Sequence, residues 1–211
     1  MIKAVTKALA ALALVLGLSS AAQAQQYYVE FTLTSSNITQ FSFGLVNSGF
    51  PTTTGNTIGQ DAAGNSVGVQ INTSVALIKG VNVGTVPNIP SGHTVGIAVD
   101  FTHNNIWFRD TASPAIWNNG TANPSNNTGG ISFATVTCPC YAAVTIFDGA
   151  GVNVATADFG ATPYAAPIPA GFGNWPGSST PANIALTTWL INALSSFSGG
   201  KFIFMGSPYG Q

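Results

Sequence analysis

Short apolar runs alternate with clusters of Gly, Asn, Pro, Ser and Thr along most of the chain, and this pattern restricts the fold more than any other feature. The clearest run is 95–101, where large apolar residues alternate with Gly96 and Ala98. Side chains of a strand point alternately to opposite faces, so this spacing predicts a strand with one large-residue face and one small-residue face. A small-residue face is expected where another layer packs closely. The run therefore predicts a central strand of an all-β protein.

The same pattern predicts the other strands and two hairpins. The polar turn 102–105 leads into 106–109, which is predicted to pair with 95–101. A second hairpin is predicted on either side of 148–151. Residues 110–130 are mostly turn-forming and predict a long irregular surface loop, a kind of segment where function tends to lie. The remaining predicted strands are 27–33, 41–45, 67–71, 74–78, 141–147 and 152–159.

The N-terminal residues 1–24 form a targeting segment. Two lysines precede an apolar stretch that closes on small residues at Ala24, which is typical of a cleaved secretory signal peptide. The apolar stretch is shorter than the roughly 20 residues that span a bilayer, and no later stretch predicts a membrane span. The mature protein is therefore expected to begin at Gln25 and to be secreted, periplasmic or held at the cell surface.

In the C-terminal extension the apolar residues recur at helical spacing and not in the alternation typical of strands. Thr180-Pro181 is a helix-start signal, and apolar residues follow at helical spacing until Gly199-Gly200. One amphipathic helix is therefore predicted at 181–197, and 201–205 is predicted to be either a last strand or an adhesive tail. The predicted organisation is a signal peptide at 1–24, one β domain at 25–176 and an extension at 177–211.

Charged residues are scarce. The chain has 5 Lys+Arg and 6 Asp+Glu, a charged fraction of 5% where soluble proteins average about 25%. Nucleic acid and anionic membranes are disfavoured as partners, because neutralising phosphates requires clusters of Lys and Arg. Glycoside hydrolysis needs two carboxylates, and Glu30 is the only glutamate. Neither His93 nor His103 lies in a triad motif. We therefore expect a protein that is not an enzyme, with no cofactor and no metal.

Several short motifs follow one another in a characteristic order. The central one is Gly92 to Asp100 followed by 105–108, and the others are 27–31, 41–45, 117–120, 123–124, 128–131, 141–144, 157–160 and 169–172. The set, covering roughly residues 26–175, resembles the SPRY domain family, particularly its bacterial and phage members. The resemblance implies a bent, two-sheet antiparallel β-sandwich of concanavalin-like architecture that binds ligands through loops at one end. The chain departs from the family at Asp158, where an Asn is common, and in its extension after 176.

Residues of the 102–105 turn and the 110–130 loop are the candidate ligand contacts. An exposed Trp117 flanked by amides is a platform for stacking on a sugar or anchoring a protein. The alternative is that Trp117 folds back to cover a sheet edge. The candidate ligand-binding residues are Trp117, Asn118, Asn119, Asn126, His103 and Asn104.

The residues just before this loop are predicted to have structural roles and not to contact a ligand. Trp107 and Phe108 are expected in the core because they lie in a predicted strand. Arg109 and Asp110 are expected to pair with each other.

Cys138-Pro139-Cys140 holds both cysteines of the chain. Export favours oxidation, but a bridge between residues i and i+2 requires a bend, which Pro139 helps to provide. The sequence leaves open a local disulfide, reduced or intermolecularly paired thiols, and metal binding.

Two functions remain compatible with the sequence. The first is a secreted, non-catalytic binding module that recognises a protein or a glycan through loops at one end of the sandwich. The second is a cell-surface or appendage subunit that self-associates through the apolar 181–205 segment, since low charge reduces repulsion between copies.

Overall fold

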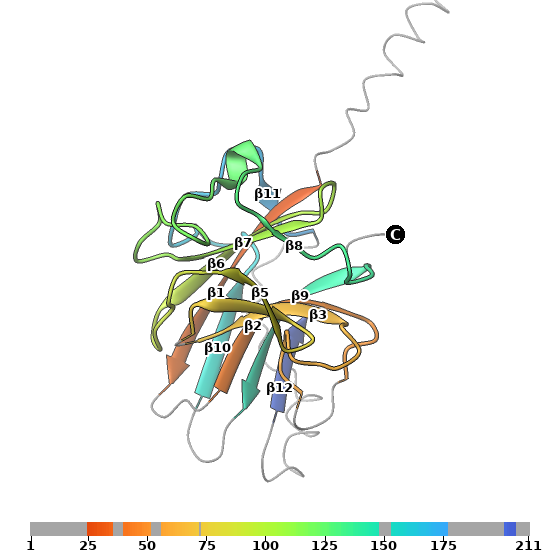
Figure 1. Cartoon of the computed structure of the whole chain (residues 1–211). Helices are drawn as coiled ribbons and strands as arrows, with labels where there is room; N and C mark the ends of the chain where they lie inside the picture. Colours follow the sequence, from red (N-terminus) through yellow and green to blue (C-terminus); the bar gives the residue numbers. More distant parts are fainter. Residues whose placement is uncertain are drawn as a thin grey trace, which may run out of the picture.

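The structure, a computed structural model, describes residues 25–35, 40–51, 56–71, 73–147, 153–176 and 201–205. Within these ranges the chain is almost entirely β, and its one helical element is the 3-10 turn η1 (Pro124–Asn126). Two six-stranded sheets pack against each other (Figure 1). The prediction of an all-β antiparallel sandwich is therefore confirmed. The predicted signal peptide at 1–24 and the predicted helix at 181–197 lie outside the described residues.

The first sheet, sheet A, has the order β10-β1-β6-β7-β8, and β11 also pairs with β1. All its pairings are antiparallel except the parallel pairing of β11 with β1. Its strands are β1 (Gln26–Ser35), β6 (Thr94–Asp100), β7 (Asn105–Asp110), β8 (Ile131–Ser132), β10 (Asn153–Asp158) and β11 (Gly173–Asn174).

The second sheet, sheet B, has the order β12-β9-β2-β3-β4-β5, with antiparallel pairing throughout. Its strands are β2 (Gln40–Asn47), β3 (Ser66–Gln70), β4 (Val75–Ile78), β5 (Val81–Thr85), β9 (Cys140–Phe147) and β12 (Lys201–Met205). Residues 201–205 therefore form a last strand, one of the two alternatives that the sequence left open.

Every predicted strand forms close to its predicted bounds, but one predicted hairpin is wrong. The pairing of 95–101 with 106–109 is confirmed as β6 with β7, where Val99 lies opposite Ile106. The pairing of 141–147 with 152–159 is not found, because β9 belongs to sheet B and β10 to sheet A. Both edges of β9 are already occupied, by β2 and β12, so β10 pairs with β1 instead.

The main core fills the space between the two sheets. It includes Phe31 of β1, Phe43 of β2, Ile97 of β6 and Phe108 of β7, each fully buried. Burial of such large apolar side chains is the main stabilising contribution in a sandwich of this kind. In the described part of the chain, no helix is long and apolar enough to cross a membrane.

The outer face of sheet A carries a second apolar layer. It is built from Tyr28, Ala98, Trp107, Trp117 and Ala122, with aromatic residues of the 164–172 segment packed against it. Trp107 and Phe108 are both fully buried, on opposite faces of β7, as the core prediction requires.

The small residues of β6 make room for this layer. A Cβ at Gly96 would lie 2.3 Å from Tyr28 Oη and 2.9 Å from Arg109 Nε. The predicted close packing on the small-residue face of 95–101 is confirmed.

Candidate ligand-binding face

Arg109 is the centre of the polar contacts on the outer face of sheet A. Its Nε and Nη2 donate to Tyr28 Oη at 3.2 and 2.7 Å. Nη1 donates to the carbonyl of Pro114 at 3.1 Å, and Nη2 to the carbonyl of Pro167 at 2.7 Å. The buried guanidinium therefore ties the 110–130 loop and the 160–172 segment to the same point of the sheet.

The predicted pairing of Arg109 with Asp110 is wrong. The two residues are neighbours in β7 and therefore point to opposite faces of the sheet. Asp110 Oδ2 instead lies 2.6 Å from His93 Nδ1, and Asp110 Oδ1 accepts a hydrogen bond from Ala112 N at 3.0 Å. Asp110 thus fixes the start of the loop, while Arg109 holds its middle.

Glu30 completes a buried network with Arg109 through Tyr28. Its Oε1 accepts hydrogen bonds from Tyr28 Oη at 2.6 Å and Ala166 N at 3.2 Å, and its Oε2 accepts one from Ala165 N at 2.7 Å. Burial raises the pKa of the Tyr28 hydroxyl. The positive charge of Arg109 lowers this pKa, and the hydrogen bond to Glu30 raises it further. The Tyr28 hydroxyl therefore stays protonated, and it connects Arg109 to Glu30 by accepting hydrogen bonds from the first and donating one to the second.

Asp158 lies directly opposite Glu30 on the neighbouring strand β10. Its carboxylate accepts hydrogen bonds from Gly160 N, at 2.8 Å, and from Thr162 Oγ1. Like charges placed opposite one another are unfavourable unless other groups compensate them. Here the donors of the 160–166 segment bind both carboxylates, so the pair anchors that segment, and its oxygens are occupied by internal contacts.

The anchored segment forms a shallow open depression of about 470 Å³. Tyr164 forms part of its floor: its hydroxyl donates to the Tyr28 carbonyl at 3.0 Å, and its ring packs edge-on against Tyr28 at 4.8 Å between centroids. Burial, and then the charges of Asp158 and Glu30, raise the pKa of Tyr164. All the lining residues are uncharged: Gly160, Thr162, Pro163, Tyr164, Ala165, Ala166, Pro167, Ile168 and Asn174.

Trp117 is buried, with 6% of its surface exposed, so the prediction of an exposed platform is wrong. Its ring packs edge-on against Tyr28 at 6.3 Å, and the Arg109 guanidinium lies 4.4 Å from its centroid. A cation over an indole face is a favourable contact that also covers apolar surface. Trp117 folds back onto the protein, as in the second alternative, but it covers the outer face of sheet A and not a sheet edge.

Asn118 is also buried and acts as a substitute strand partner for β7. Its Oδ1 accepts a hydrogen bond from Phe108 N at 2.8 Å, and its Nδ2 donates to the carbonyls of Ile106 at 3.2 Å and Gly129 at 2.8 Å. Because β8 pairs with β7 only at 105–106, this amide satisfies the Ile106 carbonyl at the end of that pairing and the Phe108 N–H beyond it. Asn118 therefore holds the loop and is not positioned to contact a ligand.

Asn119 and Asn126 are exposed at the loop surface. Asn119 Oδ1 accepts hydrogen bonds from Thr121 N and Thr121 Oγ1, at 3.1 and 3.0 Å. Asn126 lies in η1, which Asn123 caps by accepting from Ser125 N. These internal contacts order the loop surface.

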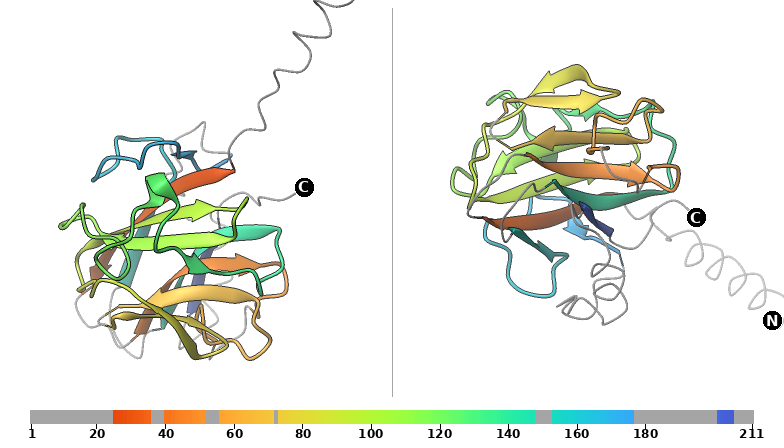
Figure 2. Two further views of the ribbon diagram at one scale, coloured as in Figure 1. Left: turned by 45° about the horizontal axis from the view of Figure 1, so that its top comes forward. Right: turned by 90° about the horizontal axis from the view of Figure 1, so that it is seen from below.

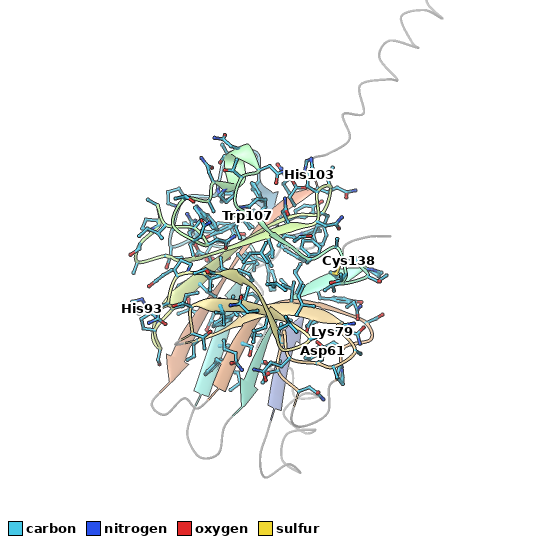
Figure 3. The ribbon with its side chains drawn as sticks, in the orientation of Figure 1. Asp61, Lys79, His93, His103, Trp107 and Cys138 are labelled. Carbon is cyan, nitrogen blue, oxygen red and sulfur yellow. A yellow bond between two sulfur atoms is a disulfide. The ribbon has the colours of Figure 1, made fainter. Side chains whose placement is uncertain are left out.

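His103 and Asn104 lie in the β6–β7 turn, next to the end of the long loop. The turn and the loop are joined by a 2.9 Å hydrogen bond from Asn105 Nδ2 to Asn127 Oδ1. The His103 side chain is 55% exposed, and its Nδ1 lies 2.7 Å from Asp100 Oδ2. His93 lies at the other end of the β6–β7 hairpin, so the structure does not bring the two histidines together (Figure 3).

The Asp100 carboxylate holds this turn through hydrogen bonds from Thr102 N, His103 N and the His103 ring. Burial works to raise its pKa, but hydrogen bonds from Gln26, from the His103 ring and from His103 N outweigh burial and hold the pKa below the ordinary 3.8. A carboxyl whose pKa is lower in the folded state than in the unfolded state stabilises the fold at pH values above the unfolded-state pKa. This stabilisation is lost as the pH falls through the folded-state pKa.

We expect the free energy of unfolding to fall as pH drops below 3.8, and the Asp100→Asn variant to show a shallower decline over the same range. The variant removes the titrating group and is expected to be less stable at neutral pH. Urea denaturation of both proteins at a series of pH values measures this. Equal slopes in the two proteins would show that Asp100 does not carry the acid sensitivity.

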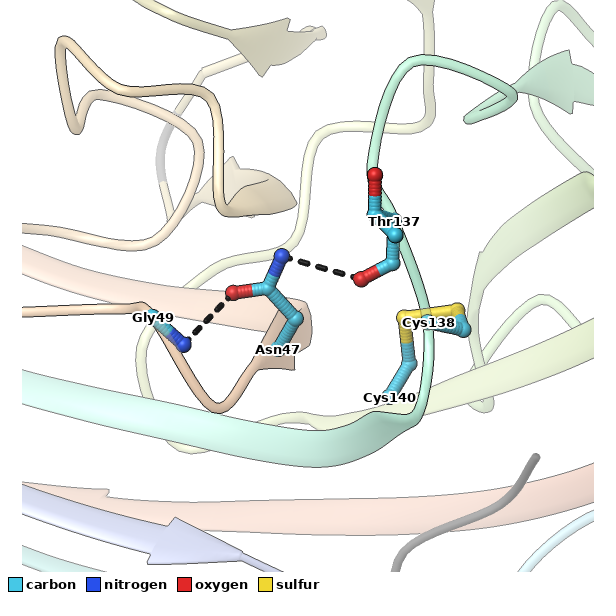
Figure 4. The surroundings of a disulfide bond; sticks show 5 residues. All are labelled: Asn47, Gly49, Thr137, Cys138 and Cys140. Carbon is cyan, nitrogen blue, oxygen red and sulfur yellow. Dashed lines mark hydrogen bonds between the residues drawn. A yellow bond between two sulfur atoms is a disulfide. The ribbon is translucent and has the colours of Figure 1, made fainter. Parts of the chain in front are cut away.

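Cys138 and Cys140 form a local disulfide, the first of the three outcomes left open (Figure 4). The Cys138–Pro139 peptide bond is cis. Next to the bridge, Asn47 Nδ2 donates to the Thr137 carbonyl at 3.0 Å, which ties this turn to the end of β2. Metal binding by these cysteines is therefore ruled out in the bridged protein. Within the described ranges, no group of three or more His, Cys, Asp or Glu residues is placed to hold a metal.

No family model matches the chain, and a search of curated proteins finds no match either. The SPRY resemblance therefore stays a prediction.

Sequence reasoning missed the network of Glu30, Tyr28 and Arg109 and the depression over Tyr164. A signal was present, because the only glutamate of the chain and one of its three basic residues after position 24 both lie within apolar strands. Charged residues are almost never fully buried unless they are paired.

Proposed function

We propose that this protein is a secreted, non-catalytic binding module that recognises a protein or a glycan on the outer face of sheet A. The ligand contacts are the depression over Tyr164, the exposed residues of the 110–130 loop, and the turn at His103 and Asn104. The observation that carries the proposal is the depression itself, a concave and uncharged surface built on a fixed polar network.

The chemistry of this face favours an uncharged ligand. Glu30, Arg109 and Asp158 are each held by internal hydrogen bonds, which leaves amide, hydroxyl and prolyl groups at the surface. Asn119 and Thr162 are exposed and offer polar contacts, while Pro163 offers an apolar one. Such mixed, neutral surfaces suit the hydroxyl groups of sugars and the backbone of a peptide.

Rigidity supports the same proposal. Arg109 holds both covering segments, and Glu30 fixes the backbone of Ala165 and Ala166 beneath the depression. A preformed site loses less conformational entropy when its ligand binds. The SPRY resemblance also implies a scaffold that binds through loops.

Filling the depression is expected to weaken binding. Ala165 lines it and is exposed, so Ala165→Trp blocks the space without disturbing the core. Ala63 is an exposed alanine in the 56–65 segment beside sheet B, and Ala63→Trp is the matched control. After screening arrays of neutral glycans and of extracellular proteins, we expect Ala165→Trp to raise the Kd at least about tenfold and Ala63→Trp to leave it unchanged.

Equal affinities of Ala165→Trp and the parent chain would place the ligand elsewhere. In that case Asn119→Ala and Asn126→Ala test whether the loop alone carries binding. The absence of any ligand in both screens contradicts the proposed function.

The alternative function, self-association through 181–205, stays a prediction. Of that segment the structure describes only the backbone of β12, which pairs with β9 at the edge of sheet B.

A further inference from the structure

The depression over Tyr164 has its side-chain hydroxyls turned inward as hydrogen-bond donors. It lies on the 160–174 segment, which the left-hand view of Figure 2 shows in blue at the outer margin of the molecule, beside the start of β1. Tyr164 Oη donates to the Tyr28 carbonyl at 3.0 Å, and Thr162 Oγ1 donates to the Asp158 carboxylate. A hydroxyl has one proton and two acceptor lone pairs. The exposed Thr162 hydroxyl can therefore only accept a hydrogen bond from a ligand.

The backbone N–H groups of the same lining are also committed. The N–H groups of Ala165 and Ala166 donate to the Glu30 carboxylate at 2.7 and 3.2 Å. Pro163 and Pro167 have no N–H. Along 163–167, at most one backbone N–H is therefore left for a ligand, whereas every residue keeps its carbonyl.

Negative charge lies beneath this surface. Glu30 and Asp158 are opposite each other on β1 and β10, and their hydrogen-bond donors are all uncharged groups. Arg109 reaches Glu30 only through the Tyr28 hydroxyl. Burial, and then the charges of Asp158 and Glu30, raise the pKa of Tyr164, so these charges are felt at the floor of the depression. An anionic ligand is therefore disfavoured.

Asn174 adds an acceptor at the rim. Its side chain is exposed, and its Nδ2 donates to the Gly160 carbonyl at 3.3 Å, which leaves Oδ1 for other contacts. Building on the proposed binding function, we propose that the ligand of the depression is a neutral glycan. Its hydroxyl groups donate hydrogen bonds to Thr162 Oγ1 and Asn174 Oδ1.

A glycan fits this surface better than a peptide does. A sugar hydroxyl can rotate to donate, whereas a peptide brings one carbonyl acceptor with every N–H. Peptide carbonyls that face the lining would lose water and find few donors, which is unfavourable. Pro163, Pro167 and Ile168 supply apolar contacts for the C–H face of a sugar ring.

A cationic ligand gains little from the two carboxylates. Glu30 is buried, and both of its oxygens accept internal hydrogen bonds. Each Asp158 oxygen also accepts one, from Gly160 N or from Thr162 Oγ1. A ligand amine would therefore give up its water for a charge that it cannot contact closely, and neutral hydroxyl donors are favoured.

An array of neutral hexose oligosaccharides, run beside an array of neutral peptides, tests the proposal with the whole chain. The tightest glycan is then compared by titration calorimetry with two kinds of analogue. Deoxyfluoro analogues replace one hydroxyl at a time and remove its donor at nearly unchanged size. A uronic acid analogue replaces a CH₂OH group by a carboxylate. We expect the most sensitive deoxyfluoro position and the uronic acid each to raise the Kd at least about tenfold.

Substitutions at Thr162 test the same contact from the protein side. Thr162→Val keeps the shape of the side chain but removes its oxygen, and it is expected to raise the Kd at least about fivefold. Thr162→Ser keeps the hydroxyl and is expected to restore the parent Kd. Thr135→Val changes an exposed threonine in the turn between β8 and β9 and is expected to leave the Kd unchanged. The analogues alter only the ligand, so they stay decisive if Thr162→Val loosens the segment.

The possible results separate this inference from the proposed function. Binding of peptides alone would overturn the glycan assignment and leave the proposed binding function standing. The same holds for a uronic acid analogue that binds as tightly as its neutral parent, for deoxyfluoro analogues that all keep the parent Kd, and for a Thr162→Val protein with unchanged affinity. If no glycan, peptide or extracellular protein binds, both are wrong.

Discussion

Gly44→Ala is expected to prevent stable folding of the sandwich. Gly44 of β2 lies opposite Gly68 of β3, and a Cβ at Gly44 would lie 1.9 Å from the Val67 carbonyl oxygen and 2.7 Å from Gly68 Cα. These are backbone atoms, so no side-chain rotation relieves the overlap. Its φ of +154° adds strain for any residue with a Cβ. The β2–β3 ladder must open, and we expect a loss of more than about 4 kcal/mol in the free energy of unfolding.

Gly173→Ala is the matched control for this change. Gly173 lies in the short strand β11, and a Cβ there would meet nothing within 4 Å. We expect its free energy of unfolding to stay within about 0.5 kcal/mol of the parent chain. Urea denaturation of the three proteins compares them. A Gly44→Ala protein that is as stable as Gly173→Ala would show that β2 and β3 are not paired in this register.

The two glycines Gly44 and Gly68 also leave room for a loop to pack on the outer face of sheet B. A Cβ at Gly68 would lie 2.5 Å from Ile58 Cγ2, so the loop before β3 packs directly onto the sheet surface. Ile58, Phe50 and Val46 form a small apolar cluster there. The two glycines therefore allow the outer face of sheet B to be covered.

Local pattern predicted the strands well because alternation depends on neighbouring residues only. Strand β5 was missed because Val81–Thr85 is exposed throughout, apart from the half-buried Gly84, and buries no large side chain. Strands β8 and β11 have two residues each, too few for a period to be detected. The wrong hairpin at 148–151 had correct strands, but the choice between sheets depends on β2 and β12, which lie far away in the sequence.

The candidate site was predicted less well, because its contacts are long-range. Trp117 lies in a polar loop, and its burial depends on Tyr28 and Arg109, which belong to two different strands. The β1–β6–β7 register places Glu30 and Arg109 on either side of Gly96. Strand register is set by the whole sheet, so the link between these two charges cannot be obtained from local spacing.

Arg109→Met is the second substitution with a large expected effect. Methionine keeps part of the apolar contact with Trp117, but it removes the donors to Tyr28 Oη and to the Pro114 and Pro167 carbonyls. It also leaves Glu30 buried without the cation that the Tyr28 hydroxyl connects to it. Removing one partner of a buried charge network typically costs about 3–5 kcal/mol, and we expect a loss of that size.

Lys79→Met is the matched control, since Lys79 is exposed and the change also converts a basic residue to methionine. We expect its effect to stay within about 0.5 kcal/mol. The double variant Arg109→Met with Glu30→Gln tests the link directly: because the amide removes the uncompensated charge, its loss of stability should be smaller than the sum of the two single losses. Additive losses would mean that Arg109 and Glu30 act independently, and that the two covering segments are held by separate contacts.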